Sequence, residues 1–203
     1  MKIEKIILAS QSPRRKQLLE WAKIPFDIII PDTAESYDNS LSPFEIAEQI
    51  AEDKALAVKK KIIDADANVN GYTILAADTI VVLGNKIIGK PAGREDAINT
   101  LKKLSGKTHA VITGVCLLSE GHKKIFFDET LVEFHKLSQG QVEYYVDTYK
   151  PYDKAGAYAI QEWIGVIGIK SINGDFYNVM GLPVSRVVNE LESFGYPDKL
   201  SRG

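Results

Sequence analysis

The chain has 203 residues, of which 45% are hydrophobic and 26% are charged, and 25 Lys and Arg against 27 Asp and Glu give a formal net charge of −2. These proportions are typical of a soluble globular protein and exclude a disordered tail, a collagen-like repeat and a disulfide-stapled miniprotein. The near-neutral charge argues against a dedicated nucleic-acid-binding domain, which is normally strongly basic, but it allows a small anionic substrate. We expect one compact unit or a two-lobed one.

The single cysteine, Cys116, lies in an apolar run and is expected to be an inert buried thiol. Near the N-terminus the apolar run Ile6–Ser10 is too short for a signal peptide, which needs about 7–15 apolar residues, or for a spanning helix, which needs about 20. We therefore expect a cytoplasmic protein with no membrane partner.

The first third of the chain alternates between short apolar runs and helical periods, which is typical of α/β proteins. A buried strand is expected at Lys5–Ala9, followed by a helix with Ser12 as its N-cap and a proline at its first position. A second strand is expected at Phe26–Ile30. Ser42 and Glu45 then have the spacing of a capping box, which predicts the start of a long helix.

The middle of the chain contains its most strand-like run, Thr73–Leu83, which a Gly-Asn turn reverses into Lys86–Ile88. An amphipathic helix over Arg94–Leu104 is expected to stop at a glycine. Two further β-runs, Thr108–Ser119 and Lys123–Leu137, flank a Glu-Gly turn and predict a hairpin.

In the last third, Ser138 is expected to cap a helix that buries Val142, Tyr145 and Val146. Strands are then expected at Ala157–Ile160 and Val166–Ile169, and a final helix at Pro183–Phe194. The pattern as a whole predicts a mixed sheet with helices around it, elongated into two lobes.

The first candidate for chemistry is the segment between the first strand and its helix, which contains Ser10, Ser12, Arg14 and Arg15. Ligands of open α/β sheets bind at strand ends, where a helix N-terminus offers free amides and a positive dipole to phosphate. A guanidinium can also bind phosphate through two parallel hydrogen bonds. The alternative is an ordinary N-cap with both arginines in solvent.

The second candidate is Asp78, a carboxylate inside an apolar strand. Such a group requires a cation, a metal ion or hydrogen-bond donors, because an unpaired buried charge is costly. If it faces a cleft, it can hold a divalent ion or accept a proton from an attacking water. The alternative is a strand-end aspartate that is hydrogen-bonded to nearby backbone.

Other positions carry weaker signals. Lys90 follows the predicted turn and precedes a proline, and Asp32 and Glu35 form an acidic loop of the kind that can hold metal. Gln161 ends a segment of small residues, and its amide can read a base through paired donor and acceptor groups. Lys54 lies in a mixed-charge helix and by itself is typical of a solvated lysine.

Several familiar signatures are absent from the sequence. The three histidines have no metal-ligand spacing, which argues against a zinc site, and neither the P-loop nor the dinucleotide fingerprint occurs. The tyrosines between Tyr144 and Tyr158 are expected in the core and rim of a helix pair rather than on a base-stacking platform.

Six segments in this order closely resemble the Maf family of nucleoside triphosphate pyrophosphatases: ILASQSPRRKQLL, EDKALAV, LAADTIVVLGNKIIGKP, LKKLSGKTHAVITGV, DKAGAYAIQ and INGDFYNVMGLPV. The resemblance covers essentially the whole chain. It implies a single domain over residues 1–203 with a Maf/inosine-triphosphatase-like α/β fold, namely an elongated mixed β-sheet with helices around it and a cleft between two lobes. It also implies a homodimer and a link to arrest of cell division.

The implied activity is hydrolysis of a nucleoside triphosphate to the monophosphate and pyrophosphate with a divalent metal cation, Mg²⁺ or Mn²⁺. Asp78 corresponds to the family's proton acceptor, and Glu35 to one of the charged positions around the triphosphate. We further expect Asp78 and Glu35 to hold the metal ion. Arg14, Thr79 and Gln161 correspond to the positions that set substrate choice, and the Thr-plus-Gln combination resembles the branch that hydrolyses dTTP and UTP rather than the 7-methyl-GTP branch. The remaining charged and polar positions around the triphosphate are Ser10, Arg15, Lys54 and Lys90.

The sequence differs from the family pattern at Gln11, where relatives often have glycine, so the backbone there approaches phosphate less freely. A hypothesis from another class is a nucleotide-binding regulator of cell division with little hydrolysis. The intact set of a base and cations argues against it, because a pure binder has no need of a base.

Overall fold

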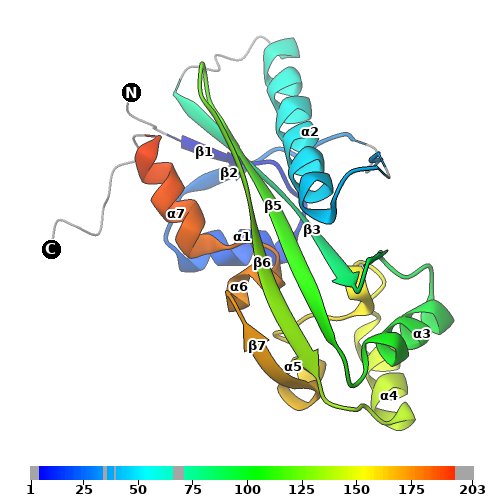
Figure 1. Cartoon of the computed structure of the whole chain (residues 1–203). Coiled ribbons are helices and arrows are strands. Elements are labelled where there is room, and N and C mark those ends of the chain that lie inside the picture. The colour runs from blue at the N-terminus through cyan, green and yellow to red at the C-terminus, as the bar shows by residue number, and fades with distance from the viewer. Residues whose placement is uncertain (1–4, 34–35, 39, 66–70, 195–203) are drawn as a thin grey trace, which may run out of the picture. The chain divides into compact units, whose positions relative to one another are not determined.

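The computed structural model describes residues 5–33, 36–38, 40–65 and 71–194. Within these residues, seven strands form one mixed sheet in the order β2-β1-β3-β5-β6-β7, and β4 pairs with β3 (Figure 1). The strands are β1 (Lys5–Leu8), β2 (Phe26–Ile28), β3 (Tyr72–Leu83), β4 (Lys86–Ile88), β5 (Thr108–Leu118), β6 (Lys123–Phe134) and β7 (Ile169–Asn173). The predicted α/β class with a mixed sheet is confirmed.

The helices are α1 (Pro13–Trp21), α2 (Pro43–Asp64), α3 (Arg94–Leu104), α4 (Gln139–Tyr149), the 3₁₀ turn η1 (Ala155–Ala157), α5 (Trp163–Gly168), α6 (Phe176–Met180) and α7 (Val184–Ser193). None of these described helices combines the length and the hydropathy that a membrane-spanning segment requires.

The chain separates into two compact units. Unit 1 consists of Met1–Asp78, Gly114–Phe127 and Gly181–Gly203, and unit 2 of Thr79–Thr113 and Asp128–Met180. Strands β3, β5 and β6 contribute residues to both. A single domain with a cleft between two lobes stays a prediction.

In unit 1, β1 is the centre of a parallel pairing. Ile6, Ile7 and Leu8 are buried, and β1 pairs in parallel with β2 on one side and β3 on the other. Parallel strands cannot be joined by a tight turn, so the chain crosses over between them, through α1 after β1 and through α2 before β3. This arrangement brings the carboxyl end of β1 beside the middle of β3.

The capping box predicted at the start of α2 is present. The Ser42 hydroxyl accepts a hydrogen bond from the Glu45 amide at 3.3 Å, and the Glu45 carboxylate accepts one from the Ser42 amide at 2.8 Å. These two bonds satisfy backbone donors that the first turn of a helix leaves without partners. The predicted helix start is confirmed.

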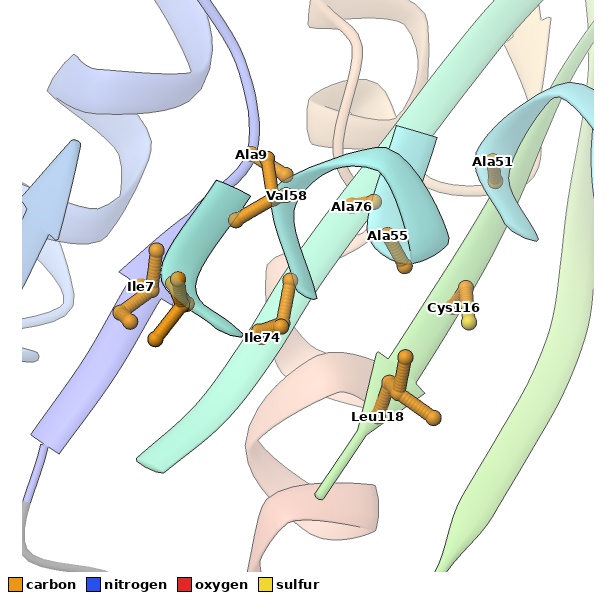
Figure 2. Packing of buried hydrophobic residues seen from close by; sticks show 10 residues of the cluster. Ile7, Ala9, Ala51, Ala55, Val58, Ile74, Ala76, Cys116 and Leu118 are labelled. Atoms are coloured by element: carbon orange, nitrogen blue, oxygen red, sulfur yellow. The ribbon is translucent and has the colours of Figure 1, made fainter. Parts of the chain in front are cut away.

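One face of α2 packs on the strands of unit 1. Small residues on the helix bring it close to the sheet, and the cluster shown in Figure 2 consists of Ile7, Ala9, Ala51, Ala55, Val58, Ile62, Ile74, Ala76, Cys116 and Leu118. Burial raises the pKa of the Cys116 thiol to about 12, so this sulfur stays protonated. The prediction of a buried cysteine is confirmed.

Helices α2 and α7 cover opposite faces of β6 in unit 1. Lys123 of β6 pairs with Glu52 of α2 at 2.5 Å, whereas the neighbouring Lys124 lies 3.6 Å from Glu190 of α7. Arg186 of α7 likewise lies over the Phe126 ring, with its guanidinium carbon 4.6 Å from the ring centroid. Successive side chains of a strand point to opposite faces, so the two helices lie on the two sides of the sheet.

Unit 2 contains the other ends of β3, β5 and β6 together with β4 and β7. Its core includes Val81, Val111 and Val132, one from each long strand. Helices α3 and α4 are linked by a two-pronged ion pair in which Arg94 donates to both carboxylate oxygens of Asp147, at 2.6 and 2.9 Å. Ser138 is the N-cap of α4, as predicted, and it forms a second capping box with Gln141.

Two strand predictions in unit 2 are wrong. The segment Ala157–Ile160 is a 3₁₀ turn followed by irregular chain, because Gly156 and Ala157 have left-handed backbone with φ of 72° and 59°. The segment Val166–Ile169 is mostly helix α5, and β7 begins only at its last residue. A Cβ on Gly165 would lie 1.7 Å from the Ile160 carbonyl oxygen, so this helix depends on a close approach that an apolar pattern does not reveal.

Candidate active site

The predicted phosphate-binding segment lies at the carboxyl end of β1 in unit 1. The ladder between β1 and β3 pairs Leu8 with Leu75 and continues with a 2.8 Å hydrogen bond from the Ala9 amide to the Leu75 carbonyl. Ser10 follows directly, and Asp78 lies a few residues beyond Leu75 along β3. Ser10 and Asp78 come from distant parts of the sequence, and both follow the stretch in which β1 and β3 are paired in parallel.

Ser10 and the first turn of α1 form a small hydrogen-bonded motif. The buried Ser10 hydroxyl accepts from the Ser12 amide at 3.1 Å and from Nη1 of Arg15 at 3.3 Å. The Ser12 side chain caps the helix by accepting from the Arg15 amide at 3.5 Å, and proline is the first helical residue, as predicted.

The two arginines of this segment differ in their surroundings. Arg15 is buried, and its Nε donates to the Gly181 carbonyl oxygen at 2.7 Å, so its guanidinium ties α1 to the chain before α7. Arg14 is half-buried. The alternative of two solvated arginines is wrong for Arg15.

Lys54 and Asp78 form a buried ion pair at the predicted site. Nζ of Lys54 on α2 donates to Oδ1 of Asp78 on β3 at 2.6 Å, and both residues are 8% exposed. The prediction that Asp78 requires a charged or hydrogen-bonding partner is confirmed, and the interpretation of Lys54 from its own sequence context as a solvated lysine is wrong. The pair places a buried cation directly on Oδ1 of Asp78.

The predicted metal ligand Glu35 lies outside the described residues. Among the residues that the structure does describe, no cluster of three or more His, Cys, Asp or Glu side chains could hold a metal ion by itself. Asp78 is therefore the described carboxylate that remains as a predicted ligand. Mg²⁺ is commonly held by one or two carboxylates together with water and substrate phosphates, and a single protein carboxylate fits that mode.

Thr79, Lys90 and Gln161 belong to unit 2. Thr79 follows Asp78 on β3 and is half-buried, and its hydroxyl lies 3.0 Å from that of Thr113 on β5. Lys90 is exposed and follows Gly89, whose carbonyl accepts from the Gly156 amide at 3.3 Å. The structure thus brings the loop that carries Lys90 beside the small-residue segment.

Gln161 is exposed at the end of that segment, and the chain around it is fixed by a buried polar group. The Tyr145 hydroxyl of α4 donates to Oε2 of Glu162 and accepts from the Ala159 amide at 3.1 Å. Nζ of Lys154 lies 3.7 Å from the other oxygen of Glu162. The prediction that Tyr145 is buried is confirmed, since it is 0% exposed.

Thr113 and Asn178 of unit 2 were not among the predicted site residues. Each is a fully buried polar residue, and Asn178 lies on the unpredicted short helix α6. A threonine inside an apolar strand was the available signal for Thr113, because a buried hydroxyl needs a partner.

A family model described as "Maf-like protein" matches residues 5–194 of this chain. The chain belongs to the Maf family. The "dTTP/UTP pyrophosphatase" of Bacteroides thetaiotaomicron is 48% identical over 92% of this Maf chain and 94% of its own length. The protein of the same name from Porphyromonas gingivalis strain ATCC 33277 is 45% identical over 96% of each chain. Among solved structures, the Staphylococcus aureus Ham1 protein aligns over 94% of this chain and 100% of its own, at 16% identity and a TM-score of 0.48.

The predicted resemblance to the Maf family is therefore confirmed. Within this Maf chain, the roles of individual residues stay predictions. Unit 1 contains the buried Lys54–Asp78 pair and the Ser10–Arg15 motif, and unit 2 contains the three remaining positions, Thr79, Lys90 and Gln161.

Proposed function

We propose that this chain hydrolyses dTTP and UTP to the monophosphate and pyrophosphate. Relatives named dTTP/UTP pyrophosphatase, 45% to 48% identical over nearly the whole chain, support the substrate class. The observation that carries the chemistry is the buried Lys54–Asp78 pair, at 2.6 Å. A carboxylate held in one orientation by a cation has the arrangement of a general base with its positioning group.

In this proposal Asp78 accepts a proton from the water that attacks the α-phosphorus, and pyrophosphate leaves. Lys54 orients the carboxylate and adds positive charge. Phosphoryl transfer of this kind depends on positioning and on stabilisation of negative charge, so a base and several cations suffice without a covalent nucleophile.

The remaining positive charge is assigned to the triphosphate. In unit 1, Arg14 and the first amides of α1 are proposed to bind its oxygens, while Arg15 and Ser10 hold that loop in shape through their shared 3.3 Å hydrogen bond. In unit 2, Lys90 is proposed as a further triphosphate contact, and Thr79 and Gln161 as positions that select the base.

Divalent metal, Mg²⁺ or Mn²⁺, is proposed as the cofactor. Asp78 would hold it, with Glu35 as a second ligand, and most of its other ligands would be phosphate oxygens and water. When bound, such an ion neutralises charge on the triphosphate and acidifies water.

A substrate panel tests the proposal. The purified chain is incubated with dTTP, UTP, CTP, GTP and 7-methyl-GTP, with and without Mg²⁺ or Mn²⁺, and monophosphate and pyrophosphate are quantified. We expect metal-dependent formation of both products, fastest from dTTP and UTP. Faster cleavage of GTP or 7-methyl-GTP would contradict the base assignment, and nucleotide binding without pyrophosphate release would favour the regulator hypothesis.

We also propose, from the family resemblance, a homodimer in the cytoplasm and a link to arrest of cell division. Light scattering coupled to gel filtration measures the oligomeric state. Overexpression of the wild type and of an Asp78→Asn variant measures whether any division arrest requires turnover.

A further inference from the structure

The segment of unit 2 that ends in Gln161 has its two ends joined by an ion pair. Nζ of Lys154, just before the segment, lies 3.7 Å from Oε1 of Glu162, just after it. The Lys154 side chain is 10% exposed and that of Glu162 is 21% exposed, so water screens this contact less than an ion pair at the surface. The pair closes residues 155–161 into a loop, which we call the Gln161 loop.

Glu162 is held from a second side. Its other carboxylate oxygen, Oε2, accepts a hydrogen bond from the Tyr145 hydroxyl on α4, and this hydroxyl accepts one from the Ala159 amide of the loop at 3.1 Å. Tyr145 is fully buried. The Glu162 carboxylate therefore links the cation at the start of the Gln161 loop to a buried side chain of a helix.

The Gln161 loop has a backbone that its own residues do not favour. Ala157 has a φ of 59°, in the left-handed region that residues with a Cβ seldom adopt. Residues 156–160 are buried, and Gln161 follows them as an exposed side chain. Such a backbone persists only where its surroundings hold it, and the ion pair is one of the contacts that do so.

The Gln161 loop also contacts the chain that carries Lys90. The Gly156 amide donates to the Gly89 carbonyl at 3.3 Å. A Cβ on Gly156 would lie 3.0 Å from Cγ2 of Val81, so the start of the loop packs closely on β3. A shift of the loop would therefore move Gln161 directly and Lys90 through its neighbour.

We propose that Lys154 and Glu162 are positioning residues, and that their ion pair holds the Gln161 loop in the form that presents its last residue to the base. Through the contact of the loop with the chain before Lys90, the same pair keeps that lysine in place for the triphosphate. The inference rests on the proposed function, which assigns Lys90 and Gln161 to the substrate. These two positions bind the nucleotide before the reaction as well as during it, so loss of the pair should raise KM and leave kcat nearly unchanged.

Glu162→Gln tests the role of the pair with little change in shape. The neutral amide can still accept from Tyr145, and Lys154 retains Asp153 as a partner at 2.7 Å, so no buried charge is left alone. We expect KM for UTP to rise by about 3- to 10-fold and kcat to stay within about 2-fold of the wild type. A general loss of stability would instead lower the amount of active protein, which reduces the apparent kcat and leaves KM unchanged.

Asp153→Asn is the matched control. It makes the same carboxylate-to-amide change on a partner of the same lysine, and this contact is the shorter of the two. Asp153 precedes Lys154 directly and its side chain is 62% exposed, so its contact does not join the ends of the loop. We expect KM for UTP to stay within about 2-fold of the wild type. An equal rise of KM in both carboxylate variants would overturn the inference, because the charge around Lys154 rather than closure of the loop would then set KM.

Two double-mutant comparisons test the coupling. Lys154→Met should raise KM for UTP as Glu162→Gln does, and the two changes together should raise it no further, because both remove one interaction. In a chain that carries Lys90→Ala and Gln161→Ala, the Glu162→Gln change should no longer alter KM. Fully additive effects in either comparison would overturn the inference. If Lys154→Met does not fold, the second comparison decides.

The inference and the proposed function fail separately. KM and kcat are measured from the rate of pyrophosphate release, and circular dichroism checks that each variant is folded. A folded Glu162→Gln variant with the wild-type KM for UTP would overturn the inference while the proposed function stands. Absence of pyrophosphate release from UTP by the wild type would overturn both.

Discussion

Nζ of Lys54 lies 2.6 Å from Oδ1 of Asp78, and both side chains are buried in unit 1. One residue is on a long helix and the other is in the middle of a long strand, so the contact exists only in the folded chain. An ion pair of this kind stabilises the fold little compared with a well-packed apolar pair, because both charges lose their hydration.

The first prediction is that Asp78→Asn nearly abolishes turnover while the chain stays folded. The amide has the shape of the carboxylate and still accepts a hydrogen bond from Lys54, but it cannot take up a proton from water. Pyrophosphate release and circular dichroism are measured on the same preparation. Asp53→Asn, an exposed change on α2, is the control and should retain activity. Wild-type-like turnover in the Asp78 variant would remove this residue from the mechanism.

The second prediction concerns the other partner of the pair. Lys54→Met leaves the Asp78 carboxylate buried without its cation, which should lower the free energy of unfolding by about 3–5 kcal/mol. Urea unfolding followed by tryptophan fluorescence measures the loss. Lys60→Met, an exposed change on the same helix, should shift the midpoint little. Equal effects of the two substitutions would show that the pair contributes nothing specific.

Much of the fold is predictable from local signals, and its failures have identifiable causes. The capping box at Ser42 was found because both of its partners lie within four residues. The strand predicted at Ala157–Ile160 is absent, because the left-handed backbone of Gly156 and Ala157 leaves no trace in an apolar pattern. Burial of Lys54 depends on a strand that follows much later in the chain, so its own helix gave the wrong indication.

A third prediction follows from close packing in unit 1. A Cβ on Gly114 of β5 would lie 2.2 Å from the carbonyl carbon and oxygen of Ala47 on α2, so backbone would have to move. Gly114→Ala should lower the free energy of unfolding by about 2–3 kcal/mol. Gly140→Ala, in the first turn of α4 with open space around it, should instead raise it by about 0.5–1 kcal/mol. Thermal unfolding of the two variants checks both signs, and a stable Gly114→Ala variant would contradict the packing.

A fourth prediction concerns His109, which is 2% exposed and bonded through Nε2 to the Tyr158 hydroxyl at 2.7 Å. Burial lowers the pKa of His109 from 6.5 to about 4. The unfolded chain therefore binds a proton in this interval that the folded chain does not. The free energy of unfolding should fall as the pH drops through the window, by up to about 1.4 kcal/mol per pH unit from this group.

Urea unfolding between about pH 7 and about pH 4.5 measures this dependence. His109→Gln removes the titrating group and should give a shallower loss of stability towards acid. An identical slope for the variant and the wild type would show that His109 is not held neutral by burial.

The sequence predicted which residues form the candidate site better than it predicted their surroundings. The resemblance identified Asp78, Arg14 and Gln161 by type and order, without indicating what surrounds them. Burial of Thr113 and Asn178 was not predicted, because their hydrogen bonds join segments that lie far apart in the sequence. The structure adds the contacts of the described ones, such as the buried pairing of Asp78 with Lys54.

The most direct measurement is hydrolysis of UTP in ¹⁸O-labelled water, with the products separated and weighed by mass spectrometry. Activation of water for attack on the α-phosphorus predicts that the label enters UMP and that pyrophosphate is unlabelled. Label in pyrophosphate, or the appearance of UDP and orthophosphate, would contradict the proposed reaction.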